Sequence, residues 1–489
     1  MKINLLFFYV ICYNVIGDKM KKTKIVCSIG PSSINPDVME KMVNEGMNVA
    51  RINFSHASFD NSLEIINSVK EVRRRTGKNL GLLFDTKGPE FRNDEVIEGG
   101  IELKEGNTIR VVKKHLIGDN EKFSVNHPEA LDSLKIGDNI LLENGLMKIE
   151  VISIEDDGVT CKVISGGILG SKKSLNVPGV HLKVPFMSEK DKSDIVFACQ
   201  NDGDFLAASF VSCKEDVLEI RKILDEQNSE MKIISKIENT TAIKNIEEII
   251  DVSDGIMVAR GDLGVEASME DLPHYQKDII KRCRAHSKFV IVATEMLESM
   301  KENLRPTRAE VSDVANAVLD GTDAVMLSGE TTVGKYPVEV VSTMADICEK
   351  QEEFVDFDRN YDFNRKNNIV ETVATSAVAS ANELEAKLIV TGTLSGYTAR
   401  KLSNMKPDCI IFSTCHEEKV ARSLSLYYGV ETDVIEFYKS TDEMIDNSIK
   451  HAKEKFNLQP GDLVVVTGGF TENMFQKHTT NLMKIVEIK

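Results

Sequence analysis

The sequence KIISKIENTTAIKNIEEIIDVSDGIMVARGD, at residues 232–262, contains one strand, one helical segment and a second strand. Two short apolar runs rich in β-branched residues, 232–238 and 255–260, enclose a longer segment with a helical pattern. Alternation of this kind is typical of a parallel βαβ unit. The pattern of residues 232–262 therefore predicts that this part of the chain is built from repeated βαβ units.

The same alternation occurs eight times between residue 24 and about residue 349. Eight strand and helix pairs in succession predict a TIM barrel. The expected barrel strands are residues 24–30, 48–54, 80–86, 205–211, 232–238, 255–260, 289–295 and 324–329.

The regular spacing is interrupted once, between the third and fourth barrel strands. Segments with a period of two replace the helices there, and Asn144-Gly145 and Asp157-Gly158 are strong hairpin turns. A β domain inserted at residues 88–183 is therefore predicted. The barrel is expected to comprise residues 20–87 and 184–349.

A third domain is predicted at residues 350–489, after a polar stretch at 351–368. Strands and helices alternate again in this part of the chain, which is typical of an open α/β sheet. Its expected strands are residues 388–392, 409–413, 434–437, 463–469 and 484–488.

The first nineteen residues include an apolar run at 3–16 that resembles a short signal peptide. Only one lysine precedes this run and no A-x-A cleavage site follows it, whereas Met20 stands directly before the first good strand. We expect residues 1–19 to be a dispensable N-terminal extension.

Composition excludes several classes of protein. The 489-residue chain is 42% hydrophobic and 28% charged, which is ordinary for a globular protein of several domains. Its net charge of -17 argues against a general nucleic-acid binder, because such proteins gather Lys and Arg against phosphates. No apolar run is long enough to span a bilayer. The nine cysteines include no C-x-x-C pair, which indicates neither a zinc site nor a disulfide framework and favours the cytoplasm.

Polar residues stand at the end of nearly every expected barrel strand, where TIM-barrel enzymes carry their active sites. Side chains alternate along a strand, so Lys236 shares a face with Glu238. Arg51 shares a face with Asn53 and Ser55 for the same reason. The other polar residues at strand ends are Asp85, Thr86, Arg260, Asp262, Thr294, Ser328 and Glu330.

Glu238 and Asp262 come from the ends of adjacent strands and are predicted to hold one divalent cation. Mg²⁺ suits this pair, because it prefers oxygen ligands and also binds waters and substrate phosphates. The cations Arg51 and Lys236 would neutralise the charge of a transferring phosphoryl group. The alternative is that these charges only form salt bridges in the barrel mouth, but burying so many polar groups without a use is costly.

Residues 329–335, GETTVGK, follow the glycine-rich pattern of a phosphate-binding loop as far as Lys335. Tyr336 then stands where Ser or Thr should bind Mg²⁺. The segment also ends the eighth barrel repeat, whereas such loops belong to doubly wound sheets. We therefore do not expect a nucleotide loop here.

The chain resembles the pyruvate kinase family from about residue 22 to its end. The motifs that carry this resemblance stand in the family's order and are TKIVCSIGPSS (23–33), GMNVARINFSH (46–56), FDTKGPEFR (84–92), ISKIEN (234–239), GIMVARGDLGVE (255–266) and PTRAEVSDVANAVLDGTDAVMLSGET (306–331).

The resemblance implies phosphoryl transfer from phosphoenolpyruvate to ADP in the last step of glycolysis. It implies that Lys236 and Arg51 bind the phosphoryl group and that Glu238 and Asp262 bind Mg²⁺ or Mn²⁺. Thr294, with water, and Ser328 remain two candidates for the donor of a proton to the enolate. The other implied positions are Gly261, Asp262 and Thr294 for the substrate, Asn53, Arg92 and Lys173 for the nucleotide, and Asn53, Ser55, Asp85 and Thr86 for K⁺.

Glu90 follows the implied K⁺ positions, where the chain enters the inserted domain. We expect it to be an uncompensated acid near the bound phosphates, which raises the need for a monovalent cation. Similar proteins with Lys at this position do without K⁺, because the ammonium group fills the electrostatic role. The resemblance therefore implies that K⁺ dependence turns on Glu90.

The C-terminal domain contains a turn rich in hydroxyl groups at residues 393–398. The resemblance places a sugar-phosphate activator there, with Thr393, Ser395 and Thr398 as ligands, and it makes this domain regulatory. A plain helix cap and turn would have a similar sequence. The resemblance also implies a homotetramer, and the identity of the activator stays open.

Two other functions are alternatives to phosphoryl transfer, and the sequence argues against both. A metal-dependent C–C lyase on a similar barrel would need no lid for a nucleotide, so the inserted domain with Lys173 argues against it. A non-catalytic sensor of sugar phosphates would not need Lys236, Glu238 and Asp262 together.

Overall fold

The computed structural model describes residues 21–55, 57–355, 368–436, 440–469 and 480–489, so the expected extension at 1–19 lies outside the described residues. These residues form two compact units, and each is described by itself. One unit comprises the described residues within Met1–Phe84, Gly203–Phe205 and Ile280–Lys489, and the other comprises Asp85–Asp202 and Leu206–Ile279.

Eight strands close into a barrel in the order β1-β16-β15-β14-β13-β12-β3-β2. The neighbours β1 and β16, β1 and β2, β13 and β14, and β15 and β16 pair in parallel. The predicted TIM barrel is confirmed, and each strand lies within its expected range. The bounds are β1 Lys24–Ser28, β2 Val49–Asn53, β3 Gly81–Asp85, β12 Phe205–Ala208, β13 Lys232–Ile237, β14 Gly255–Ala259, β15 Phe289–Ala293 and β16 Ala324–Leu327.

Several helices of the barrel begin at side chains that cap them. Ser188 accepts a hydrogen bond from the Asp191 N–H at 3.1 Å, and the Asp191 carboxylate accepts one from the Ser188 N–H at 3.2 Å. This reciprocal cap satisfies two backbone donors that a helix start leaves open. The bounds are α2 Pro36–Asn44, α3 Phe59–Thr76, α4 Glu189–Gln200, α5 Lys214–Glu226, α6 Thr240–Lys244, α7 Ile246–Val252, α8 Arg260–Glu266, α9 Leu272–Ala285, η2 Glu298–Lys301, α10 Arg308–Asp320, α11 Gly329–Thr332 and α12 Pro337–Glu352.

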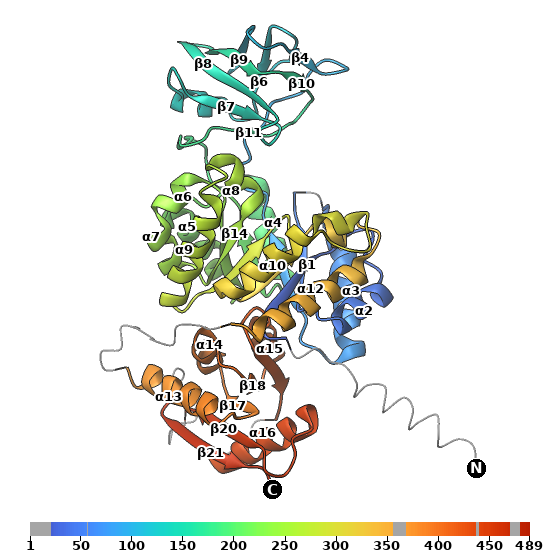
Figure 1. The fold of residues 1–489 in the computed structure, drawn as a ribbon. Helices are drawn as coiled ribbons and strands as arrows, with labels where there is room; N and C mark the ends of the chain where they lie inside the picture. The colour runs from blue at the N-terminus through green and yellow to red at the C-terminus, as the bar shows by residue number, and fades with distance from the viewer. Residues whose placement is uncertain (1–20, 56, 356–367, 437–439, 470–479) are drawn as a thin grey trace, which may run out of the picture. The chain divides into compact units, whose positions relative to one another are not determined.

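The inserted segment forms β-sheets around its own apolar core, as predicted (Figure 1, teal). Six strands are ordered β11-β7-β8-β9-β5-β6, and β10 pairs with β4. Asn144 and Gly145, with φ of 55° and 86°, lie in the turn between β7 and β8. The bounds are β4 Ile101–Leu103, β5 Thr108–Val112, β6 Lys122–Ser124, η1 Pro128–Ser133, β7 Asn139–Leu142, β8 Met147–Glu155, β9 Gly158–Ser165, β10 Gly167–Leu169 and β11 Leu175–Asn176.

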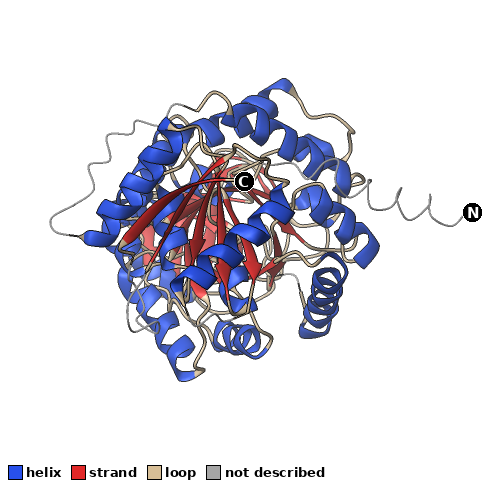
Figure 2. Cartoon of the chain, turned by 90° about the horizontal axis from the view of Figure 1, so that it is seen from below, coloured by secondary structure: helices blue, strands red, loops and turns tan. Residues whose placement is uncertain are grey.

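The C-terminal segment is an open α/β sheet in the order β19-β18-β17-β20-β21, with helices packed on it (Figure 2). The expected strand at 434–437 is wrong, because the strand is β19 at Val430–Val434. The polar Thr432 and Asp433 hid it from an apolar pattern, although Thr432 is buried. The other bounds are α13 Ile369–Glu383, β17 Leu388–Gly392, α14 Tyr397–Asn404, β18 Ile410–Cys415, α15 Glu418–Ser423, α16 Thr441–Phe456, β20 Leu463–Gly468 and β21 Leu482–Glu487.

The predicted domain boundaries stay predictions. Among the described residues, no helix has both the length and the apolar character needed to cross a membrane.

Buried ion pairs join the C-terminal segment to barrel residues of the same unit. Asp204 lies just before β12 and accepts hydrogen bonds from Arg73 of α3 at 3.0 Å and from Arg422 of α15 at 3.0 Å. Lys406 contacts Asp323 at 2.5 Å, just before β16. The Lys24 ammonium group, at the start of β1, contacts the Glu431 carboxylate at 2.9 Å.

The Asp204→Ala variant should lose about 3–5 kcal/mol of unfolding free energy, because it removes a buried carboxylate that the guanidinium groups of Arg73 and Arg422 share. The measurement is a urea unfolding curve followed by circular dichroism. The Glu302→Gln variant breaks the exposed pair with Lys335, whose side chains are 70% and 61% exposed, and serves as the control. Equal midpoints for the two variants would contradict the structural role of Asp204.

Candidate active site

Lys236 lies near the end of β13 at the centre of a charged cluster. Its ammonium group donates hydrogen bonds to Ser209 Oγ at 2.7 Å and to Asp85 Oδ1 at 3.2 Å, and it lies 2.9 Å from Glu238 Oε1. The Lys236 side chain is 12% exposed, and those of Asp85 and Glu238 are 1% exposed. The structure therefore brings together three residues that the sequence placed at strand ends, in a place almost free of bulk water.

Glu238 and Asp262 are acids whose ionised forms are disfavoured. Burial raises the pKa of Glu238 to about 7; the nearby Lys236 opposes this rise, and the Asp262 carboxylate adds to it. Burial also raises the pKa of Asp262, against the effect of Lys236 and with that of Glu90 and Asp85. Buried carboxylates that repel each other fit a divalent cation, because its charge removes the repulsion.

Mg²⁺ fits this pair in ligand type, since it takes carboxylate oxygens and keeps several waters. Within the described part of the chain, no group of three or more His, Cys, Asp or Glu side chains is arranged to hold a metal ion. One or two protein carboxylates with substrate oxygens are the usual protein site for this ion.

Ser209 follows β12 and belongs to the cluster, although the sequence did not single it out. Its hydroxyl donates to the Thr86 carbonyl oxygen at 2.7 Å and lies 3.2 Å from Asp85 Oδ1. Phe210, the next residue, donates its N–H to Glu238 Oε2 at 2.6 Å. The signal that could have found Ser209 is its place directly after a barrel strand, like that of Thr86 after β3.

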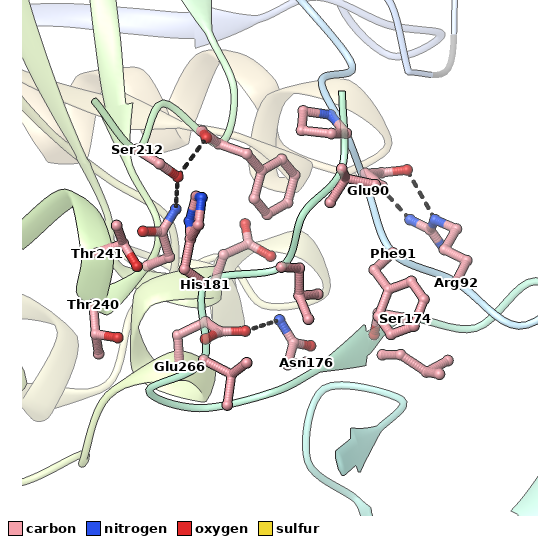
Figure 3. A pocket seen from close by; sticks show the side chains of 18 of the residues that line it. Glu90, Phe91, Arg92, Ser174, Asn176, His181, Ser212, Thr240, Thr241 and Glu266 are labelled. Carbon is pink, nitrogen blue, oxygen red and sulfur yellow. Dashed lines mark hydrogen bonds and ion pairs between the residues drawn. The ribbon is translucent and has the colours of Figure 1, made fainter. Parts of the chain in front are cut away.

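Glu90 is not an uncompensated acid, so the expectation about its charge is wrong. Arg92 donates from Nε to Glu90 Oε2 at 2.8 Å and from Nη2 to Oε1 at 3.0 Å (Figure 3). Although burial raises the pKa of Glu90, these hydrogen bonds lower it below its ordinary value. Lys173, the other expected nucleotide ligand of the inserted domain, pairs with Glu143 at 2.5 Å.

Arg51, Asn53 and Ser55 lie in the other unit, at the end of β2. Arg51 is buried, and its Nη1 donates to Ser28 Oγ at 2.7 Å. The Ser55 N–H donates to Asn53 Oδ1 at 3.0 Å, so these two residues form one turn. Asp85 and Thr86 belong to the charged cluster around Lys236. Binding of K⁺ by the four expected ligands stays a prediction.

Thr294 and Ser328 follow β15 and β16. Thr294 has a φ of 71°, which is rare for a β-branched residue and marks a strained backbone of the kind found at functional sites. The Ser328 N–H donates to the buried Glu330 carboxylate at 2.7 Å. Gly261 lies in α8 beside Asp262. The roles expected for Thr294, Ser328 and Gly261 stay predictions.

A cavity of about 450 Å³ opens beside Asp262 in the unit that contains the inserted domain (Figure 3). Asn176 of β11 donates to Glu266 of α8 at 3.0 Å, so this wall is joined to the inserted domain by a hydrogen bond. Asn239 donates to Ser212 Oγ at 3.1 Å on another wall. Arg92 and Lys173 also line the cavity, which places two of the three expected nucleotide ligands in one cavity with Asp262.

The expected activator residues lie at the start of α14. Gly396 caps this helix with a φ of 75°, a conformation that favours glycine. Thr398 Oγ1 lies 2.7 Å from Thr480 Oγ1, and both residues are buried. The Thr393 N–H donates to the Thr414 carbonyl oxygen at 2.9 Å. The Thr398 hydroxyl thus has a protein partner, and activator binding by Thr393, Ser395 and Thr398 stays a prediction.

A TIM barrel whose strand ends gather a buried lysine and repelling carboxylates is typical of a metal-dependent enzyme that handles a phosphoryl group. Two family models match the chain, "Pyruvate kinase, barrel domain" at residues 20–341 and "Pyruvate kinase, alpha/beta domain" at residues 371–486. The chain belongs to the pyruvate kinase family.

Curated relatives agree with this assignment. A pyruvate kinase from Staphylococcus epidermidis is 44% identical over 471 residues, which cover 95% of this chain and 80% of the relative. One from Bacillus licheniformis is 44% identical over 472 residues, with the same coverage. A crystal structure of a pyruvate kinase from Cryptosporidium parvum superposes with a TM-score of 0.90 at 38% identity and covers 96% of each chain.

Mg²⁺ should bind more tightly at about pH 8 than at about pH 6, because protons compete with the metal for Glu238, whose pKa is about 7. The stability of the metal-free protein should instead fall as the pH rises. A carboxyl group whose pKa is raised in the folded state stabilises the protein at low pH. This contribution is lost as the pH rises through about 7. The rise in Tm caused by Mg²⁺ should therefore be larger at the higher pH.

Two isosteric variants control this measurement. Glu238→Gln cannot ionise and should abolish the pH dependence of the Mg²⁺ effect. Glu266→Gln removes an acid that lines the cavity beside Asp262 and whose pKa burial also raises, and it should leave the Mg²⁺ effect unchanged. A Tm rise that is equal at both pH values in the unaltered protein would contradict the assignment of Glu238.

Proposed function

We propose that this chain transfers the phosphoryl group of phosphoenolpyruvate to ADP and that Lys236, Glu238 and Asp262 form the centre of the reaction. The observation that supports this most is the contact of the Lys236 ammonium group with Glu238 at 2.9 Å in a nearly buried cluster. A lysine in such a place acts on charge that develops nearby far more strongly than it would in water.

The proposed chemistry needs positive charge more than it needs a nucleophile from the protein. In the transition state, charge is spread over the three outer oxygens of the phosphoryl group. Lys236 and Arg51 would neutralise this charge from fixed positions, so little reorganisation is needed during the reaction. Glu238 and Asp262 would hold a divalent cation, which would supply further positive charge against the phosphoryl group.

The substrates are assigned to the residues that match the family motifs. Gly261, Asp262 and Thr294 would contact phosphoenolpyruvate, and either Thr294 with water or Ser328 would supply a proton to the enolate. Arg92 and Lys173 would contact the nucleotide together with Asn53. Arg92 and Lys173 are already paired with Glu90 and Glu143, so ADP must compete with these carboxylates.

K⁺ is the second proposed cofactor. Asp85 and Thr86 offer oxygens beside Lys236, and the family motifs add Asn53 and Ser55. One carboxylate among neutral oxygens fits a single positive charge. A homotetramer, a cytoplasmic location and a sugar-phosphate activator bound by Thr393, Ser395 and Thr398 are proposed from the resemblance alone.

The Lys236→Met variant should lower kcat at least ~100-fold, the order expected for removing one fixed electrostatic group from a transition state. The assay follows pyruvate from phosphoenolpyruvate and ADP by coupling it to lactate dehydrogenase, with Mg²⁺ and K⁺ present. The Lys232→Met variant removes the same charge at the other end of β13 and should keep the rate. A Lys236→Met enzyme with nearly unchanged kcat would remove Lys236 from the mechanism, and an unaltered chain without ADP-dependent turnover would refute the proposed function.

The unaltered enzyme should be slow when K⁺ is replaced by tetramethylammonium at equal ionic strength, which keeps general screening constant. Glu90→Lys should restore the rate without K⁺, because an ammonium group then stands near the bound phosphates. Glu90→Gln is the matched control, since it also releases Arg92 from its pair but adds no cation. Equal kcat of the unaltered enzyme in both salts would refute the K⁺ proposal.

A further inference from the structure

The loop after β12 contributes no side chain to which the family motifs assign a role, yet Ser209 touches the residue proposed to be central. Its hydroxyl accepts a hydrogen bond from the Lys236 ammonium group at 2.7 Å. We propose that Ser209 is a positioning residue, whose hydroxyl holds the Lys236 ammonium group where it meets the transferring phosphoryl group. This inference rests on the proposed function of Lys236.

The hydroxyl is oriented so that it accepts from Lys236. A serine hydroxyl has one hydrogen and two lone pairs. The Thr86 carbonyl oxygen and the Asp85 carboxylate can both only accept, and the carbonyl oxygen, at 2.7 Å against 3.2 Å for Asp85 Oδ1, is the nearer acceptor for this hydrogen. A lone pair of Ser209 Oγ is then left for the ammonium group, which can only donate.

Ser209 differs in charge from the two acids that contact Lys236. Glu238 and Asp85 are carboxylates, and they offset the positive charge of lysine that the reaction needs. Both are also proposed to bind cations, Glu238 the divalent ion and Asp85 the monovalent ion. Of these three contacts, the Ser209 hydroxyl is therefore the one that holds the ammonium group without neutralising it and without a second proposed task.

The position of Ser209 is itself fixed on several sides. Ser209 is buried, and its backbone N–H donates a hydrogen bond to Thr86 Oγ1 at 3.2 Å. Gly88 packs so closely that a Cβ there would lie 2.8 Å from the Ser209 carbonyl oxygen. Phe210 follows with a φ of 58° and binds Glu238 through its N–H. A constrained loop of two residues thus contacts both Lys236 and Glu238.

The first test is the Ser209→Ala variant in the coupled assay with saturating Mg²⁺ and K⁺. Loss of one hydrogen bond to a charged group should lower kcat by ~10- to 100-fold. The KM for phosphoenolpyruvate should stay within about threefold, because the effect arises in the transition state. The Ser235→Ala variant is the matched control, since it removes a buried hydroxyl one residue from Lys236 that contacts Ser253 instead.

A double-mutant cycle decides whether Ser209 acts through Lys236. In the Lys236→Met background, Ser209→Ala should change kcat by less than about twofold, because the group that it positions is gone. If the two losses multiply instead, Ser209 has an independent role and the inference is wrong. If Lys236→Met alone keeps its rate, the proposed function of Lys236 fails, which is a separate outcome.

A second variant and a structural readout protect the test against a folding defect. Ser209→Cys keeps nearly the same volume but offers a weak acceptor, so kcat should again fall while the Tm stays close to that of Ser235→Ala. A crystal structure of Ser209→Ala or Ser209→Cys should show the ammonium group displaced toward the carboxylates. An unchanged kcat in Ser209→Cys, or an unmoved Lys236 side chain, would overturn the inference.

Discussion

The positive charge of Lys236 in a place nearly free of water is the constraint on which the active site depends. A buried ammonium group is costly unless acids or other acceptors surround it. The surrounding acids, Asp85, Glu238 and Asp262, bring more negative charge than one lysine can offset. Bound cations would offset this excess, which supports the proposed divalent and monovalent cation sites.

The fold was predictable wherever one pattern repeated. Eight apolar runs with polar ends gave the barrel strands to within a few residues, because each strand is buried on both faces and its sequence shows this directly. The strand β19 was misplaced because it carries Thr432 and Asp433. In that strand the partners in the sheet, rather than the hydrophobicity of the residues, determine where it begins.

The site was predictable to the extent that it follows from strand geometry. Lys236 and Glu238 were expected on one face, and the structure joins them. Glu90 and Arg92 are also two residues apart, but Glu90 lies outside the strands, so strand alternation did not predict their pair. Ser209 could not be assigned from sequence, because its contact with Lys236 depends on the distance between two neighbouring strand ends.

The ion pairs around Asp204, Asp323 and Lys24 have a consequence for the way in which this chain can change over time. The pairs Arg422–Asp204, Lys406–Asp323 and Lys24–Glu431 each join the barrel to the C-terminal segment, and all of these side chains except that of Glu431 are buried. A charge lost on one side leaves a buried charge on the other, so substitutions there are tolerated mainly in matched sets. The barrel and the C-terminal segment should therefore evolve together. Exchange of the C-terminal segment between distant relatives would break these ion pairs.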